Sequence, residues 1–357
     1  MPVPRVVVTE HQAARVCCPC CGRECRAPFP EAVGQPVQYG PNLLGFATYL
    51  HTVHLLPYAR CARIVQEITQ APFSPGSLHT ALALAAERLS DFDEQLQATL
   101  SQAPLLHVDE TGTRVKGKLN WFHVRCTDTL CRLFCHEKRG KQAVDDLRPY
   151  SGRLISDFFS NYVTLGCQHQ FCGAHHAKWL RHLRMLRELT FASEVLGQDW
   201  AGSLKSVMEA MVAACHRARD RGGAKLRDAS PLVREFDRWV QEGLKQNPLP
   251  RKPPGKRRVA RGKVRNLIDR LIDHREGYLA FLFDLSIPFT NNEAERAIRM
   301  LKVKSKVSGG FRTKSGADAF CRLRSYTQTC QKQGMCLMDC LRSVFNGKMI
   351  LPSLNHA

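Results

Sequence analysis

The sequence is poor in acidic residues and lacks any long apolar run. Its 357 residues include 32 Asp and Glu against 52 Lys and Arg, which gives a formal net charge of +20. No run of 18 or more apolar residues occurs, and the first residues, MPVPRVVVTEHQ, lack the apolar segment and cleavage pattern of a signal peptide. We therefore expect a cytoplasmic protein with no membrane span. A hydrophobic content of 44% is enough for a globular protein of two or three domains.

The positive charge is concentrated in two stretches. Residues 245–266 carry nine Lys or Arg and no acid, and residues 296–324 carry nine with only Asp318 against them. An excess of this size favours a polyanion, so DNA or RNA is the expected partner. The alternative is a solvated basic surface without a partner.

The cysteines are numerous, but a long chain without a signal peptide is expected to keep them reduced. Ten of the sixteen lie in apolar or mixed surroundings, which predicts small buried side chains. These are Cys61, Cys126, Cys131, Cys135, Cys167, Cys215, Cys321, Cys330, Cys336 and Cys340.

The N-terminal stretch CCPCCGREC has the spacing of half a zinc site. Cys18 and Cys21 are separated by two residues and followed by Gly22, as in a zinc knuckle where a tight turn points both thiolates at one metal ion. A zinc ribbon needs a second pair, and none follows at a suitable spacing. A turn without metal is the alternative.

The next part of the chain has helical apolar spacing. Residues 41–69 show this pattern with a break at Pro57, and a further helix is expected after the cap residue Ser74. Such short helices are either a DNA-binding module or a helical spacer.

From Pro104 the pattern changes to period two. Strands are predicted at 105–112, 119–128 and 130–137, then a helix around 141–150 and a strand at 152–159. This succession indicates a mixed sheet of the ribonuclease H-like kind. Asp109 ends the first strand and Asp157 the fourth, and in such a sheet these two strands are neighbours. The two carboxylates are then expected at one edge, unless each is an ordinary turn residue.

A large helical insertion is expected after the sheet. The stretch QFCGAHH brings Cys172, His175 and His176 together, and these side chains either support the aspartates or touch a phosphate. Residues 181–280 then have mostly helical spacing, with an exposed Pro- and Lys/Arg-rich interruption at 248–263.

The stretch IPFTNNEAERAIRMLKVKSKVSGGFR, residues 287–312, predicts a basic helix capped by Thr290 or Asn291. Glu295 lies on one face with Arg299 and Lys302, at i, i+4 and i+7. The simplest interpretation is a surface salt bridge between Glu295 and Arg299. The alternative is that Glu295 is a functional acid, which requires partner carboxylates elsewhere in the chain.

Several motifs in this order resemble the insertion sequence 66 family of bacterial DDE transposases, over about residues 15–345. They are CPCCGRECRAPFP, VQYGPNLLGFATYLHTVHLLPYAR, FSPGSL, HVDETGTRV, the CGAHH element, FTNNEAERAIRMLKVKSKVSGGFR and GADAFCRLRSY.

The resemblance implies an α/β protein with a ribonuclease H-like core, a helical insertion before the last acid, and a preceding zinc-ribbon remnant and helical module. The expected divisions are 1–30 (partial zinc ribbon), 31–103 (helical DNA-binding module), 104–180 (first part of the core), 181–283 (insertion), 284–345 (final part of the core) and 346–357 (tail).

The resemblance also assigns the site residues. Asp109 matches the first catalytic aspartate, Asp157 the second, and Glu295 the last acid, because Glu293 occupies a variable position between the asparagine pair and A-E-R. Cys172 and His175 match a cysteine and a histidine that follow the fourth strand.

The function implied is cleavage and strand transfer of an insertion sequence at its terminal inverted repeats. Two Mg²⁺ (or Mn²⁺) ions held by the three acids would serve this chemistry, and Zn²⁺ would bind Cys18 and Cys21. The partner is double-stranded DNA, both terminal repeats and target, with the protein assembled as a homo-oligomer in the bacterial nucleoid. Residues expected to contact DNA phosphates are Arg296, Arg299, Lys302, Lys304, Lys306 and Arg312.

The sequence also departs from the family pattern. An upstream C-x-x-C and helical segment are missing, Gly173 and Ala177-Lys178 replace asparagine and leucine-arginine, and SDFF lacks a preceding histidine. These departures favour a truncated copy, so the alternative function is an inactive DNA-binding remnant that binds element ends and inhibits a full-length transposase.

Overall fold

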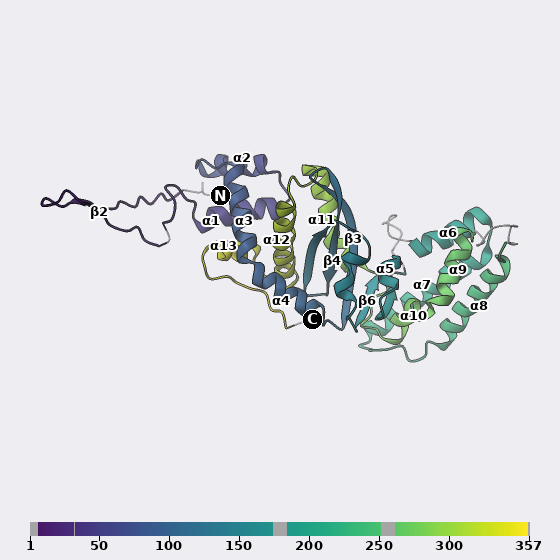
Figure 1. Cartoon of the computed structure of the whole chain (residues 1–357). Coiled ribbons are helices and arrows are strands. Elements are labelled where there is room, and N and C mark those ends of the chain that lie inside the picture. The colour runs from purple at the N-terminus through teal and green to yellow at the C-terminus, as the bar shows by residue number, and fades with distance from the viewer. Residues whose placement is uncertain (1–5, 32, 174–183, 251–260, 356–357) are drawn as a thin grey trace.

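The computed structural model describes residues 6–31, 33–173, 184–250 and 261–355. A β-sheet lies in the middle, with a helical layer on one side and a second helical group on the other (Figure 1). A small hairpin of β1 (Arg15–Cys17) and β2 (Glu24–Arg26) extends away from these parts. No helix in the described ranges is long and apolar enough to cross a membrane.

The sheet has five strands, which are β3 (Leu105–Val115), β4 (Lys118–Cys126), β5 (Cys131–His136), β6 (Arg153–Ser156) and β7 (Gln168–Phe171). Their order is β5-β4-β3-β6-β7. The first three strands pair antiparallel, whereas β6 pairs parallel with both β3 and β7. The prediction of an α/β protein with a mixed sheet is therefore confirmed.

The helix predicted around 141–150 is wrong. This segment forms two short 3-10 turns, η1 (Lys141–Ala143) and η2 (Asp145–Leu147). Pro149 lacks a backbone N–H and disfavours helical geometry in the residue before it, so little chain is left for an α-helix. The side chain of Asp146 is also fixed by two hydrogen bonds from Arg125 of β4, at 2.5 and 2.6 Å.

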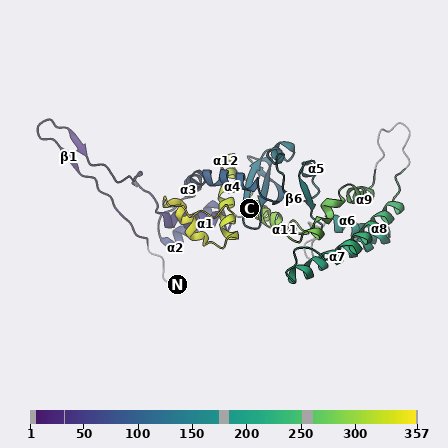
Figure 2. The same cartoon turned by 90° about the horizontal axis from the view of Figure 1, so that it is seen from below.

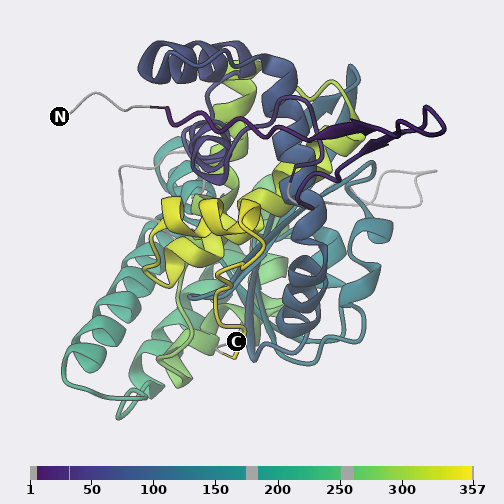
Figure 3. The same ribbon diagram turned by 90° about the vertical axis from the view of Figure 1, so that its left-hand side faces the viewer.

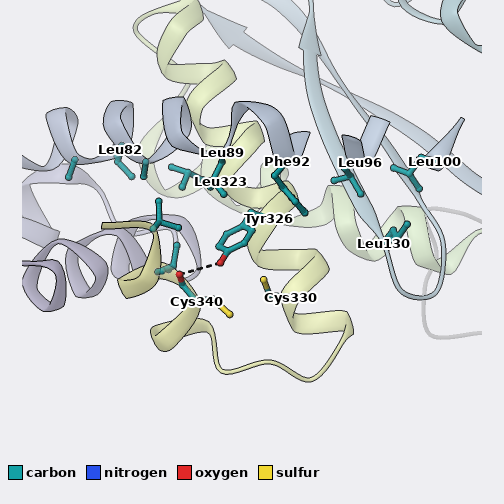
Figure 4. Packing of buried hydrophobic residues seen from close by; sticks show 14 of the residues in the cluster. Leu82, Leu89, Phe92, Leu96, Leu100, Leu130, Leu323, Tyr326, Cys330 and Cys340 are labelled. Carbon is teal, nitrogen blue, oxygen red and sulfur yellow. Dashed lines mark hydrogen bonds between the residues drawn. The ribbon is translucent and has the colours of Figure 1, made fainter. Parts of the chain in front are cut away.

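Six helices share the first hydrophobic core. They are α1 (Pro41–Thr52), α2 (Tyr58–Thr69), α3 (Pro75–Arg88), α4 (Ser90–Leu100), α12 (Lys314–Lys332) and α13 (Leu337–Phe345). Tyr326 of α12 lies at the centre, near Leu89, Phe92 and Leu96, and donates a 3.2 Å hydrogen bond to the Cys340 carbonyl (Figure 4). The helices from the two ends of the chain lie on the same side of the molecule (Figure 3).

Two local predictions for these helices are confirmed. The helical stretch 41–69 is broken at Pro57, which precedes α2. Ser74 caps α3, because its Oγ accepts a 3.0 Å hydrogen bond from the Ser77 N–H.

Helix α12 also covers the edge of the sheet. The Thr329 hydroxyl accepts from the Cys131 N–H and donates to the Cys131 carbonyl, both at 3.1 Å, and Ser325 Oγ accepts from the Leu133 N–H at 2.8 Å. Side chains of α12 thus satisfy backbone groups of β5 that an uncovered edge strand would expose.

The insertion consists of helices with a core of their own. They are α6 (Arg184–Leu196), α7 (Asp199–Asp220), α8 (Ser230–Gln246), α9 (Lys263–Asp273) and α10 (Arg275–Phe283), which pack around Trp200 and Phe236. The view from below shows this group on the far side of the sheet from the hairpin (Figure 2). The prediction of a mostly helical region holds for its described part, and residues 251–260 of the basic interruption lie outside it.

All sixteen cysteines are free thiols, as predicted. Eight of the ten expected inside are buried, whereas Cys167 is half-buried and Cys336 is exposed. The prediction that Cys336 is buried is wrong, because this residue precedes the start of α13 and lies outside the apolar face of that helix.

Candidate active site

The register of the sheet brings Asp109 and Asp157 to the same level. The parallel pairing of β3 and β6 runs from Leu105 opposite Arg153 to His107 opposite Ile155. Two residues further along each chain stand Asp109 and Asp157, on strands about 4.8 Å apart. Asp157 lies just past the end of β6, where its Oδ1 accepts a 3.1 Å hydrogen bond from the Phe159 N–H. The predicted adjacency of the two strands is confirmed.

Asn291 fixes the start of α11 (Asn292–Ser308) against β3. Its amide Nδ2 donates to the Val108 carbonyl at 2.7 Å, and its Oδ1 lies 3.0 Å from His107 Nδ1. Because the amide nitrogen already serves Val108, His107 must donate through Nδ1–H. Burial lowers the pKa of His107 and keeps the ring neutral. Glu295 follows one turn later on α11, and its charge adds to the raised pKa of Asp109.

The prediction that Thr290 or Asn291 caps this helix holds for the position of Asn291 but not for its side chain. Asn291 is the residue before α11 begins, but its side chain makes no capping hydrogen bond. The amide instead crosses to β3, where two buried polar groups would otherwise lack partners.

The end of β7 also contacts the start of α11. Cys172 Sγ accepts a 3.3 Å hydrogen bond from the Asn291 N–H, and the Gly173 N–H donates to the Phe289 carbonyl at 3.0 Å. A Cβ on Gly173 would lie 2.3 Å from the Phe289 ring, which explains a glycine at this point. Cys172 thus contacts the residue that precedes α11, and its predicted supporting role stays a prediction. His175 and His176 lie outside the described residues.

The three carboxyl groups influence one another electrostatically. Burial, followed by the charges of Glu110, Asp157 and Glu295, raises the pKa of Asp109 to about 8. Burial also raises the pKa of Glu295 to about 7, with Arg299 and Lys302 opposing the rise and Asp157 adding to it. The same acids, after burial, raise the pKa of the Cys172 thiol to about 12, so it stays protonated at neutral pH.

The donor set suits a hard divalent cation, because carboxylate oxygens that repel one another are stabilised by positive charge between them. As they stand, no three His, Cys, Asp or Glu side chains in the described ranges are close enough to hold one ion. A bound cation would therefore have to draw the carboxylates closer together.

Glu110 is a buried, hydrogen-bonded acid next to Asp109 that the sequence analysis did not single out. Its carboxylate is buried and accepts hydrogen bonds from Tyr162 Oη at 2.8 Å and from Arg139 at 2.7 and 3.0 Å. Arg139 in turn lies over the rings of Trp121 and Phe159. Neighbouring residues on a strand point to opposite faces, so the adjacency of Asp109 and Glu110 already implied that only one faces α11.

Glu293 is held away from the other acids. Its carboxylate pairs with Lys332 of α12 at 2.5 Å, and the same ammonium donates to the Thr127 carbonyl at 2.8 Å. Residues two apart on a helix point about 200° apart, so Glu293 and Glu295 face different surroundings.

The basic residues of α11 divide into two groups. Arg296, Lys302, Lys306 and Arg312 are exposed and Arg299 is half-buried, so these cations can reach an outside phosphate. Lys304 is only 5% exposed, and its ammonium lies 4.0 Å from the centre of the Phe311 ring. Burial lowers its pKa to about 8. The DNA contact predicted for Lys304 is therefore corrected, because residue 304 continues the apolar face of Ile298 and Leu301.

Comparison with known proteins identifies the chain. A family model described as Transposase IS66 family matches residues 36–319. A search of curated proteins finds no match. Since the family model covers well over half of the sequence, the protein belongs to the IS66 family of transposases.

Proposed function

We propose that this protein cleaves an insertion sequence at its terminal inverted repeats and joins the ends to target DNA by a DDE mechanism. Membership of the transposase family gives the general activity and DNA as the partner. The observation that carries the finer proposal is that Asp109 on β3 lies within electrostatic reach of Asp157, just past β6, and of Glu295 on α11, whose charges add to its raised pKa. Buried carboxyl groups with raised pKa values, such as Asp109 and Glu295, are typical of a functional site rather than a surface.

The sheet supports a ribonuclease H-like fold for the catalytic core. Three antiparallel strands followed by two parallel ones, in the order β5-β4-β3-β6-β7, agree with the succession expected for that fold. Asp157 follows the carboxyl end of β6, whereas Asp109 lies within β3, which continues to Val115, so the prediction that Asp109 ends its strand is wrong.

Asp109, Asp157 and Glu295 would hold the divalent cations, Mg²⁺ or Mn²⁺. When bound, such ions supply a nucleophilic oxygen and stabilise the leaving oxygen. The chain itself orients the carboxylates: the Glu110 N–H fixes Asp109 at 2.8 Å, the Phe159 N–H fixes Asp157, and Asn291 sets the helix that carries Glu295.

The exposed cations of α11 would bind the DNA backbone beside the scissile bond. Arg296, Lys302, Lys306 and Arg312, with the half-buried Arg299, follow Glu295 along the helix and the loop after it. Contacts of this kind are largely independent of sequence and weaken as salt is added.

The test compares Glu295→Gln with Glu293→Gln on duplexes that carry the element's own ends. We expect Glu295→Gln to bind these duplexes normally and to lose cleavage with Mg²⁺. Glu293→Gln should keep cleavage, although loss of its ion pair with Lys332 lowers stability. Cleavage by Glu295→Gln together with an inactive but folded Glu293→Gln would contradict the assignment.

The second candidate function is DNA binding without catalysis. Within the described part of the chain, no three acidic, histidine or cysteine side chains lie close enough together to hold one ion, and this favours it. A wild-type protein that binds the ends but cleaves neither with Mg²⁺ nor with Mn²⁺ would establish this alternative.

The N-terminal hairpin supports zinc binding at Cys18 and Cys21. Backbone N–H groups of Cys20 and Cys21, with the Cys21 side chain, favour the Cys18 thiolate and lower its pKa. Gly22 has φ +67°, the left-handed conformation that such a tight turn requires. Elemental mass spectrometry of the purified protein tests the proposal, and less than a tenth of an equivalent of zinc would refute it.

A further inference from the structure

The turn between β3 and β4 contains an unusual residue. Val115 pairs with Lys118, and the two turn residues have positive φ, 51° at Lys116 and 75° at Gly117. This is a type I′ turn, for which Asn-Gly is the preferred sequence. A lysine in the left-handed region costs stability, and such cost points to a use for the side chain.

The tip of this hairpin is strongly basic. Arg114, Lys116 and Lys118 are exposed, and residues 112–121 include no acid. Arg312 is exposed on the adjoining segment, which is docked on the hairpin: Lys116 N–H donates to the Phe311 carbonyl at 2.9 Å and Phe311 N–H to the Arg114 carbonyl at 2.7 Å. Among the described residues, none of these four cations forms an ion pair with a carboxylate.

The hairpin is rigidly connected to the candidate active site. Strand β3 continues without interruption from Asp109 to Val115, and α11 lies alongside it (Figure 1). A hydrogen bond of 2.5 Å between Thr113 Oγ1 and Ser305 Oγ joins the strand and the helix halfway along. At about 3.3 Å per residue, Lys116 lies about 23 Å from Asp109. This distance equals about seven base pairs of B-DNA, at about 3.4 Å each.

We propose that Arg114, Lys116, Lys118 and Arg312 form a second phosphate-binding surface for duplex DNA, about seven base pairs from the bond that is cut. This inference rests on the proposed function, because it takes Asp109 as the position of the scissile phosphate. On α11, the side chains of Arg299, Lys302 and Lys306 provide further cations between the candidate active site and the hairpin tip. The partner is a DNA backbone, since exposed cations without neighbouring acids attract phosphates whatever the base sequence.

The Lys116→Asn variant separates the two roles of this residue. Asn-Gly suits the turn better than Lys-Gly, so the variant should have a higher thermal midpoint than wild type. Loss of one phosphate contact should lower affinity for a 30-base-pair duplex about eight-fold at 0.1 M salt and reduce the slope of log K against log salt by about 0.9. Fluorescence anisotropy across a salt series measures both quantities.

The matched control is Lys225→Asn, which removes an exposed lysine from the loop between α7 and α8. It should leave the salt slope unchanged. The hairpin surface is refuted if Lys116→Asn folds and keeps the wild-type slope, or if Lys225→Asn reduces the slope equally. A wild-type protein that fails to bind duplex DNA would refute the proposed function as well, whereas wild-type cleavage with an unchanged Lys116→Asn slope refutes the hairpin surface alone.

Discussion

Replacing Asp109 with asparagine should stabilise the protein while removing DNA cleavage. In the folded protein the pKa of Asp109 is about 8, against 3.8 for an ordinary aspartate. A raised pKa means that the folded state binds more protons than the unfolded state between about pH 4 and pH 8. The stability that the neutral form provides is therefore complete below about pH 4 and is lost as the pH rises through 8.

The size of this effect follows from the shift. Each pKa unit corresponds to about 1.4 kcal/mol, so ionising Asp109 in the folded state costs on the order of 5 kcal/mol, and less where solvent reaches the carboxylate. Asparagine is nearly the same shape and carries no charge. We expect the advantage of Asp109→Asn in unfolding free energy to be small at pH 4, to grow through neutral pH, and to level off above pH 8.

Urea unfolding with a chelator present, at pH 5, 7 and 9, measures this advantage. The control Asp145→Asn removes an exposed carboxylate that pairs with Arg148, and it should show no comparable gain. Added Mg²⁺ should then raise the stability of wild type more than that of Asp109→Asn, because a cation that binds the folded state stabilises it. The reasoning fails if Asp109→Asn is equally or less stable than wild type at pH 9.

Two further substitutions test the surroundings of the site. Lys304→Met should raise the unfolding free energy at pH 7 by about 2 kcal/mol, because it removes a buried ammonium whose pKa falls to about 8. That gain should fade between about pH 8 and pH 10.5, because wild-type Lys304 loses its proton first in the folded and then in the unfolded state. Chemical unfolding at pH 7 and pH 10 measures the difference in unfolding free energy between variant and wild type, and an equal difference at both pH values would contradict this prediction. Asn291→Ala should cost about 2–3 kcal/mol by leaving the Val108 carbonyl and the His107 ring without partners, whereas Asn292→Ala serves as the control and should cost under about 1 kcal/mol. Similar urea midpoints for the two asparagine variants would show that Asn291 has no special role.

Much of the sheet could be predicted because its signals are local. Alternating apolar residues indicated β3, β4 and β5. The succession of three strands, a connection and a fourth strand was enough to expect β3 beside β6. The helical phase of α11 also contained a signal that was not used. Lys304 lies three residues after Leu301, so the apolar stripe itself pointed that lysine toward the interior.

The contacts of Asn291 could not be predicted in the same way. Its partners His107 and Val108 stand more than 180 residues earlier in the chain, and no local pattern links them. A capping role was the natural expectation for an asparagine before a helix, and tertiary hydrogen bonding replaced it. The same holds for the two 3-10 turns, where the bond between Asp146 and Arg125 depends on a strand that lies earlier in the chain.

The position of the insertion has a consequence for synthesis on the ribosome. Strand β7 ends at Phe171, whereas α11 begins at Asn292, after all the helices of the insertion. At about 5–20 residues per second, a nascent chain would carry the aspartates for about 10 s before Glu295 is made. Helix α12, which covers the edge of β5, comes later still. Until then the emerging sheet keeps an open edge at β5, where unpaired backbone groups can associate with another chain.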